Sequence, residues 1–459
     1  MNSSRKPTNV LKFAIMSIIG AFLFMVPLPD GDAFNIPLGF AINWVGGIIN
    51  SVTVNGLGLL HLLAGLIITI SFIGTVVAYL IKPAFIMESE KLKGLFLSSP
   101  VYFVSKAIAF VLVWMIYFGL GPTWLVGGDT GGVMMGLIAS SSGLIAIFIV
   151  LGIAIPLLTD FGLMEFLGIL IRKVVRFLFT LPGRSSIDLL GSWFSSSAAS
   201  VIITRDQHEK GYYTDREASA ICCNFTLVSL PFTFVVAATV GVTPFFPLFY
   251  LIICVTAILL AIIMPRIWPL RGIRDEYLPE VGKQIDEDVP LNTSIFSHAV
   301  DLASERAGKT TPEGVLRSGL SNWLNIFMDL IPVILAWGTI ALVVVEHTLI
   351  FDWISMPLGF YLNIFGVEGA YEFAPTALVG FIDMFLPAIL LDIGGAPLQT
   401  RFILGALSIV QIIYLAETGI LILKSKMPLN IGHLAIIFLM RTVLAIPVIV
   451  LITRLLFNP

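Results

Sequence analysis

The amino-acid sequence predicts an all-α polytopic membrane protein, with about nine transmembrane helices and two re-entrant helical hairpins in an inverted-topology repeat. Three observations support this prediction: the composition, the lengths of the apolar runs, and the placement of lysine and arginine. Of the 459 residues, 57% are hydrophobic and 12% are charged, and the mean hydropathy is +0.98. These values lie outside the range of soluble globular proteins and indicate that the chain uses lipid as its solvent.

Nine segments approach the ~20 apolar residues that a hydrocarbon core of ~30 Å requires of a spanning helix. They are residues 12–27, 56–81, 107–126, 133–158, 217–240, 245–264, 322–345, 400–423 and 431–455. The first follows Arg5 and Lys6, like the apolar part of a secretory signal. Because no small-residue cleavage site follows it, we expect it to be retained as a span.

The placement of lysine and arginine sets the orientation, because cytoplasmic loops carry the excess of positive charge. With the amino terminus inside, the outer segments 29–55 and 346–371 contain no lysine or arginine, whereas the inner segment 82–106 is rich in lysine. Arg401 and Arg454 are the exceptions. We therefore expect a multi-pass protein of the bacterial inner (cytoplasmic) membrane with a cytoplasmic amino terminus.

Two further apolar stretches, residues 187–204 and 374–392, are too short or too interrupted to cross. If either crossed, the later basic loops would lie on the wrong side of the membrane. We expect both to form re-entrant hairpins, the first entering from the cytoplasm and the second from outside. Both should face the protein interior, because irregular backbone at membrane depth must be satisfied by protein or by water.

An amphipathic stretch precedes each hairpin, at residues 161–180 and 350–365, and is expected to lie in the membrane interface. The order of span, interfacial helix, hairpin, span and span thus occurs twice, with opposite starting sides. We divide the chain into a three-span region (1–131), a first repeat (132–264), a cytoplasmic linker with little fixed structure (265–318) and an inverted second repeat (319–459). Inverted repeats of this kind hold a binding site between the copies, near the middle of the bilayer.

Small hydroxyl side chains gather at the expected tip of the first hairpin, at Ser195, Ser196 and Ser197. Half-helix ends at such a tip expose backbone groups to a polar ligand. Small residues also allow helices to pack closely in lipid, and the sequence leaves both interpretations open.

The fifth span contains Asn224, Thr226 and Ser229 shortly before Pro231. This pattern is typical of a proline-broken helix that offers oxygen ligands to a small ion. Ordinary hydrogen bonds between helices are the alternative for each of these residues.

Carboxylates within membrane segments are costly and therefore mark candidate sites. Glu417 lies deep in the eighth span, although a structural ion pair with Arg441 is an alternative role. The predicted substrate-binding residues are Ser195, Ser196, Ser197, Asn224, Asp383, Gln411, Glu417 and Thr418, and the predicted ion- or proton-coupling residues are Thr226, Ser229, Asp329 and Glu417.

The sequence contains no motif that indicates an enzyme. No catalytic serine-histidine-acid set, phosphate-cradling loop or metal-ligand spacing can be assigned, and the three cysteines make no ligand cluster. We expect no catalytic residue, no metal site and no cofactor other than a coupling Na⁺ or H⁺. Thr214 and Glu217 have the spacing of a capping box and are expected to begin a helix.

The stretch SSIDLLGSWFSSSAASVIITRDQHEKGYYTDREASAI resembles the nucleoside-recognition Gate-domain family of membrane proteins, specifically its YjiH-type group. The order of interfacial helix and hairpin over residues 133–455 is distantly similar to concentrative nucleoside transporters. The resemblance implies that the two hairpins and the broken spans after them hold a solute and a coupling ion.

Together, these features predict a secondary active transporter of a small polar solute, nucleoside-like or amino-acid-like, in which two hairpins give alternating access. The alternative is a non-transporting Gate-domain subunit that assembles a membrane complex. The expected partners are the solute, the lipid bilayer and either a second copy of the chain or a second Gate-domain protein. The nearly balanced net charge of −3 gives no support to nucleic-acid binding.

Overall fold

The computed structural model describes residues 6–457, except 27, 31–32, 55–56, 98–99, 122–141, 184, 195–196, 284–293, 326, 329–330, 333–334, 338, 341–343 and 345–347. Contacts between residues divide the chain into two compact units. Unit 1 comprises Met1–Pro37, Ala154–Val315 and Pro357–Pro459, and unit 2 comprises Leu38–Ile153 and Leu316–Met356. Helices α9 (Ser142–Thr159), α17 (Pro312–Asn325) and α19 (Ile350–Ile364) contribute residues to both units.

Unit 2 is built around α3 (Leu59–Leu80) and α6 (Pro100–Phe118), which pack through the stacked rings of Phe72 and Phe110, 4.9 Å apart. Lys106 of α6 is fully buried and donates to the carbonyl of Leu95 at 2.9 Å. The unit also contains α2 (Pro37–Ser51) after its first residue, the ribbon of β3 (Thr53–Val54) and β4 (Leu57–Gly58), α4 (Ala84–Met87) and α5 (Glu90–Phe96). Helix α2 is not among the predicted spans, because its apolar run, Pro37–Ile49, is too short to cross a bilayer.

Unit 1 begins with α1 (Pro7–Met25) and the ribbon of β1 (Leu28–Asp30) and β2 (Ala33–Asn35). Helix α16 (Ile295–Lys309) packs against both α1 and α10 (Leu163–Phe179). The prediction that residues 265–318 have little fixed structure is wrong here. Ala299, Ala303 and Ala307 are spaced four residues apart and form a buried face of α16. Phe13 and Phe166 pack against this face.

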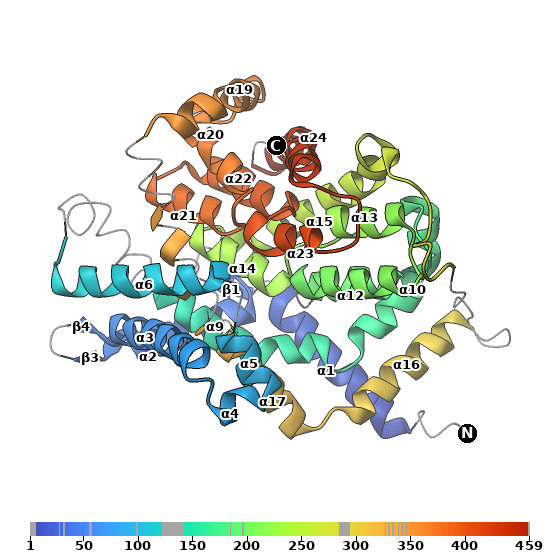
Figure 1. Cartoon of the computed structure of the whole chain (residues 1–459), viewed down its shortest axis with the longest axis horizontal. Coiled ribbons are helices and arrows are strands. Elements are labelled where there is room, and N and C mark those ends of the chain that lie inside the picture. The colour runs from blue at the N-terminus through green and yellow to red at the C-terminus, as the bar shows by residue number, and fades with distance from the viewer. Residues whose placement is uncertain are drawn as a thin grey trace. The chain divides into compact units, whose positions relative to one another are not determined.

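The helices of the two predicted copies follow one another along the chain (Figure 1), and the repeat itself stays a prediction. The first contains α10, α11 (Ser185–Phe194), α12 (Ser197–Glu209), α13 (Asp215–Asn224), α14 (Leu230–Thr239) and α15 (Phe246–Ile263). The second contains α19, α20 (Ala370–Val379), α21 (Leu386–Ile393), α22 (Leu398–Val410), η5 (Leu415–Gly419), α23 (Ile420–Leu423) and α24 (Ile431–Phe457). Helix α11 packs on α12 and α20 on α21, as two helical hairpins. The all-α class is confirmed, whereas the number of spans and the re-entrant path of the hairpins stay predictions.

Among the described residues, four helices are long and apolar enough to cross a membrane: Pro7–Met25, Leu62–Leu80, Thr243–Gly272 and Ile431–Leu455. The predicted spans 217–240 and 400–423 are absent from this set because each is broken into shorter helices. Predicted spans 133–158 and 322–345 lie partly outside the described residues. The protein is a multi-pass membrane protein.

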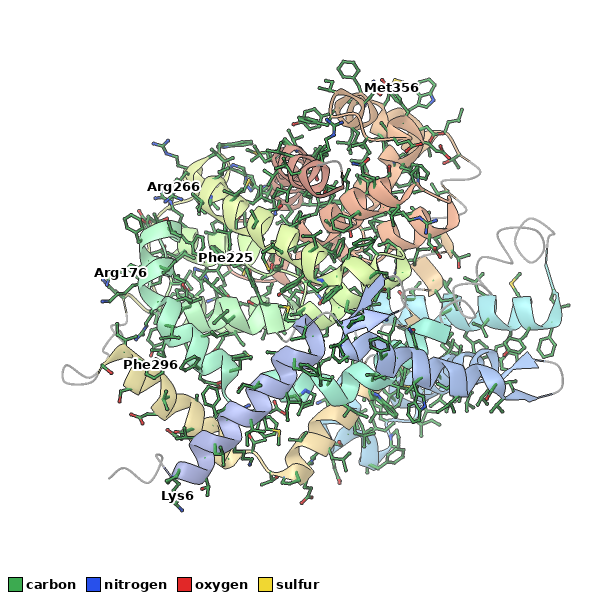
Figure 2. The ribbon with its side chains drawn as sticks, turned by 180° about the vertical axis from the view of Figure 1, so that it is seen from behind. Lys6, Arg176, Phe225, Arg266, Phe296 and Met356 are labelled. Carbon is green, nitrogen blue, oxygen red and sulfur yellow. The ribbon has the colours of Figure 1, made fainter. Side chains whose placement is uncertain are left out.

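Two arginines lie close to the end of α10 and α15 in unit 1. Figure 2 shows Arg176 and Arg266 at the same edge, with Phe225 further inside. Arg266 ends the short helix η2 (Met264–Arg266) and donates to the carbonyl of Leu178 at 2.9 Å. Phe225 is buried and meets the ring of Phe179 edge-on, with centroids 4.8 Å apart. The remaining short helices are η1 (Thr243–Phe245) and η3 (Leu270–Gly272).

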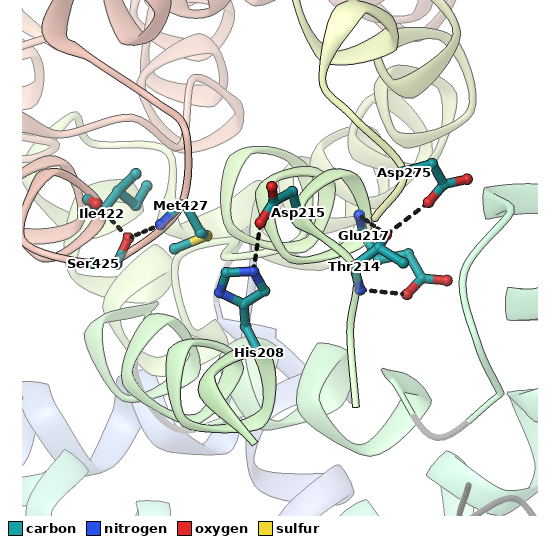
Figure 3. A network of polar contacts seen from close by, with 8 residues as sticks. All are labelled: His208, Thr214, Asp215, Glu217, Asp275, Ile422, Ser425 and Met427. Atoms are coloured by element: carbon teal, nitrogen blue, oxygen red, sulfur yellow. Dashed lines mark hydrogen bonds and ion pairs between the residues drawn. The ribbon is translucent and has the colours of Figure 1, made fainter. Parts of the chain in front are cut away.

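The start of α13 is fixed by a polar network (Figure 3). Thr214 accepts a hydrogen bond from the Glu217 amide at 3.2 Å, and the Glu217 carboxylate accepts one from the Thr214 amide at 2.9 Å, so the predicted capping box is confirmed. Thr214 Oγ1 also donates to Asp275 at 2.7 Å, which holds part of the predicted linker against α13. Nearby, His208 Nε2 lies 2.8 Å from Asp215 Oδ1 and joins the end of α12 to the start of α13.

Candidate solute-binding site

Two broken helices form the framework of the candidate site. In the first copy, the helix stops at Asn224 and resumes at Leu230. Pro231 occupies the first turn of α14, where its missing N–H costs nothing. Thr226 Oγ1 donates back to the Cys222 carbonyl at 2.7 Å, and the carbonyl of Ser229 accepts from Thr233 Oγ1 at 3.0 Å. Thr226 and Ser229 thus lie at the predicted break and bond to their own helices.

The second break, at residues 411–414, contains no proline. Ile412 adopts a positive φ of 67°, which is rare for a β-branched residue and strains the backbone. Tyr414 Oη donates to the Ser408 carbonyl at 2.8 Å, and Thr418 Oγ1 donates to the Ile412 carbonyl at 3.1 Å. These two side chains hold the break open, and the following π-helix η5 is of a kind often found at functional sites.

Glu417 of η5 meets the first hairpin. Ser197, the first residue of α12, donates from Oγ to Glu417 Oε1 at 3.0 Å. Helix α12 is in contact with both η5 and α23 (Figure 1). The partial positive charge at the start of α12 stabilises a carboxylate in this position. Ser197 is buried and Glu417 is partly exposed, so this polar contact lies where a ligand from solvent can compete with it.

The turn of the second hairpin reaches the same broken helix. The carbonyl of Phe381 accepts from the Leu415 amide, at the start of η5, at 2.8 Å. Two residues along the turn, buried Asp383 accepts from the amide of Phe385, the residue just before α21, at 2.8 Å. Ring contact between Phe385 and Phe232, with centroids 5.9 Å apart, joins this turn to α14.

Gln411 connects hairpin, break and last helix. Its Nε2 donates to the Ala377 carbonyl and to Thr442 Oγ1, each at 2.8 Å. Its Oε1 is buried without a hydrogen-bond partner and lies against Gly380, the first residue after α20. A buried acceptor without a donor is costly, which is consistent with a group reserved for a ligand.

Arg441 of α24 is fully buried and contacts both breaks. Its Nε and Nη2 donate to the carbonyl of Val410, the last residue of α22, at 3.0 and 2.7 Å. Its Nη1 donates to Asn224 Oδ1 at 2.9 Å and to the Cys223 carbonyl at 3.3 Å, at the end of α13. The guanidinium therefore bonds to both broken helices, while Glu417, considered above as its partner, accepts from Ser197.

The structure thus brings Ser197 together with Glu417, and places the second hairpin turn, Gln411 and Thr418 around the same break. Asn224 faces Arg441. Ser195, Ser196 and Asp329 lie outside the described residues. The sequence predicts no role for Tyr414 and no bond from Arg441 to the two breaks, although a lone arginine in the middle of an apolar span is a signal of function.

Replacing Gly380 by alanine should destabilise the second hairpin, because the added Cβ would collide with Gln411 Oε1. We expect a loss of about 1–3 kcal/mol in the free energy of unfolding, typical of overpacking. Gly47→Ala is the matched control, since nothing lies within 4 Å of a Cβ built there. Chemical unfolding of both variants in detergent measures the difference, and equal stability would show that the Gln411 side chain moves aside.

Comparison with known proteins identifies relatives. Residues 141–243 match the Gate family, described as nucleoside recognition. An uncharacterized protein from Alkalihalophilus pseudofirmus is 40% identical over 454 residues, covering 98% of this chain and 95% of the relative. Among solved structures, CNTnw in an inward-facing substrate-bound state is 16% identical over 99% of both chains, with a TM-score of 0.40. A CNTnw double variant in an outward-facing state is 15% identical over 97% of both chains, with a TM-score of 0.37. The chain therefore belongs to the same protein family as the Alkalihalophilus relative, and its residues 141–243 match the Gate model.

Proposed function

We propose that the protein is a secondary active transporter of a small polar solute, nucleoside-like or amino-acid-like, driven by Na⁺ or H⁺. It acts in the bacterial inner membrane with its amino terminus in the cytoplasm. The main support for this proposal is the 3.0 Å hydrogen bond between Ser197 and Glu417, which joins the first hairpin to the broken helix of the other copy. A solute with hydroxyl or amino groups can replace Ser197 as the donor, and this exchange couples solute binding to movement of the hairpin.

The second hairpin supports the same proposal. Its turn bonds to Leu415, two residues before Glu417, so both hairpins meet one five-residue π-helix. In transporters with inverted repeats, discontinuous helices supply the solute site and the two copies move against each other around it. Asp383, Gln411 and Thr418 are proposed to surround the solute beside Glu417.

The alternative function is that of a Gate-domain subunit in a membrane complex, with a second copy or another Gate protein as partner. The packing of Asn224 and Asp383 favours it, because both are buried and hydrogen-bonded within the protein. The partly exposed Glu417 favours transport.

A thermal-shift panel of purified protein against nucleosides, nucleobases, amino acids and dipeptides tests the two functions. A compound at about 100 times its Kd adds ~2.7 kcal/mol to the stability of a transporter. A folded protein that responds to no member of the panel but co-purifies with another membrane protein would support the subunit function.

Sided cysteine labelling should place the two hairpins on opposite membrane faces. Lys210, at the end of the first hairpin, and Leu398, just after the second, are both exposed in the structure. In a Cys254→Ala background, Lys210→Cys should react with a membrane-impermeant maleimide only from the cytoplasmic side, and Leu398→Cys only from outside. Cys222 and Cys223 are buried and should stay silent. Reaction of both variants from the same side would contradict the inverted repeat.

A further inference from the structure

We propose that the Arg441 guanidinium is a built-in cation that takes the place of a coupling Na⁺ between the two broken helices. This inference rests on the proposed transport function and narrows its energy source. It implies that solute binding does not require sodium.

The location is suited to a cation. Helices α13 and α22 end at Asn224 and Val410, and the last carbonyls of a helix have no partner within that helix. Each such end also carries a partial negative charge. In transporters with discontinuous helices, unwound carbonyls and half-helix ends of this kind coordinate Na⁺ or H⁺.

Arg441 satisfies both ends at once. Three guanidinium nitrogens donate four hydrogen bonds of 2.7 to 3.3 Å, to the carbonyls of Val410 and Cys223 and to Asn224 Oδ1. The side chain is fully buried, and arginine keeps its charge more persistently than any other basic residue. The oxygen ligands that a sodium ion would use are therefore committed to a fixed positive charge.

The same guanidinium connects the two predicted copies. The cation is supplied by α24 of the second copy, yet it bonds to the helix ends of both. A resident charge that bonds to both breaks satisfies their carbonyl groups without a bound ion. Proton coupling would then depend on groups that face the hairpins. Glu417 is such a group and is partly exposed.

The test compares Na⁺ with choline at constant ionic strength, on full-length protein in detergent. For the wild-type protein, both the melting temperature without solute and the Kd of any solute found in the panel should be the same in the two salts, within about twofold for Kd. In Arg441→Gln, Na⁺ should raise the melting temperature, and solute should bind about tenfold more tightly in Na⁺ than in choline, a coupling of ordinary size. Arg454→Gln, on the same helix but exposed, is the control and should respond to neither salt.

A wild-type protein that melts at higher temperature in Na⁺, or binds solute only in Na⁺, would overturn the inference. A folded Arg441→Gln variant that does not respond to Na⁺ would overturn it too. If that variant does not fold, the wild-type comparison still decides. Failure of the proposed transport function is distinct, because it appears as absence of solute binding in both salts while the melting temperatures can still be compared.

Discussion

Replacing Arg441 by methionine should lower the free energy of unfolding more than any other single change at the site. Methionine keeps much of the apolar stem but leaves the Val410 and Cys223 carbonyls and Asn224 Oδ1 without their donor. Each buried acceptor left without a partner costs about 1–3 kcal/mol, so we expect a loss of about 3 kcal/mol or more. Denaturant titration in detergent, followed by tryptophan fluorescence, measures it.

Arg454→Met provides the control on the same helix. Arg454 is exposed and donates to the Phe365 carbonyl, and a surface substitution of this type changes stability by about 0.5 kcal/mol or less. If the two variants unfold at the same denaturant concentration, Arg441 does not hold the broken helices together.

Replacing Glu417 by glutamine should abolish coupled solute uptake while leaving the protein folded. Glutamine retains an oxygen that can accept from Ser197, so the hairpin contact persists. The negative charge is lost, however, and a hydrogen bond to a charged group contributes about 1.5–3 kcal/mol, roughly 10- to 100-fold in solute affinity. A carboxamide also cannot carry a proton, so any dependence of uptake on a pH gradient should vanish.

Glu280→Gln is the matched control, because Glu280 is 75% exposed and pairs with Lys426 at 3.1 Å at the surface. Its uptake and pH dependence should equal those of the wild-type protein. Normal coupled uptake by Glu417→Gln would show that Glu417 does not bind the solute, and that its hydrogen bond with Ser197 is only structural.

The sequence predicts the all-α membrane class, because apolar run length and charge placement are strong constraints in lipid. It also predicts the break before Pro231 and the capping box at Thr214, since each depends on neighbouring residues. The second break is harder to predict, because no proline marks it. Tyr414 and Thr418 donate to carbonyls six residues earlier and so hold the positive φ at Ile412.

Long-range contacts account for the remaining surprises. Ser197 and Glu417 are 220 residues apart, and Arg441 meets Asn224 across 217 residues. No local pattern encodes such pairs, so the sequence suggests Glu417 as a partner for Arg441 on the grounds of charge alone. Likewise, the mixed charge of residues 265–318 predicts little fixed structure. Composition alone does not include the four-residue spacing of the buried alanines in α16.

Exchange in proteoliposomes tests the central claim, solute transport, most directly. Vesicles loaded with a compound that stabilises the purified protein should accumulate the same compound in labelled form from outside. We expect accumulation with wild-type protein and Glu280→Gln, and little or none with Glu417→Gln or empty vesicles. Tight binding of a compound without exchange of any label by the wild-type protein would contradict it.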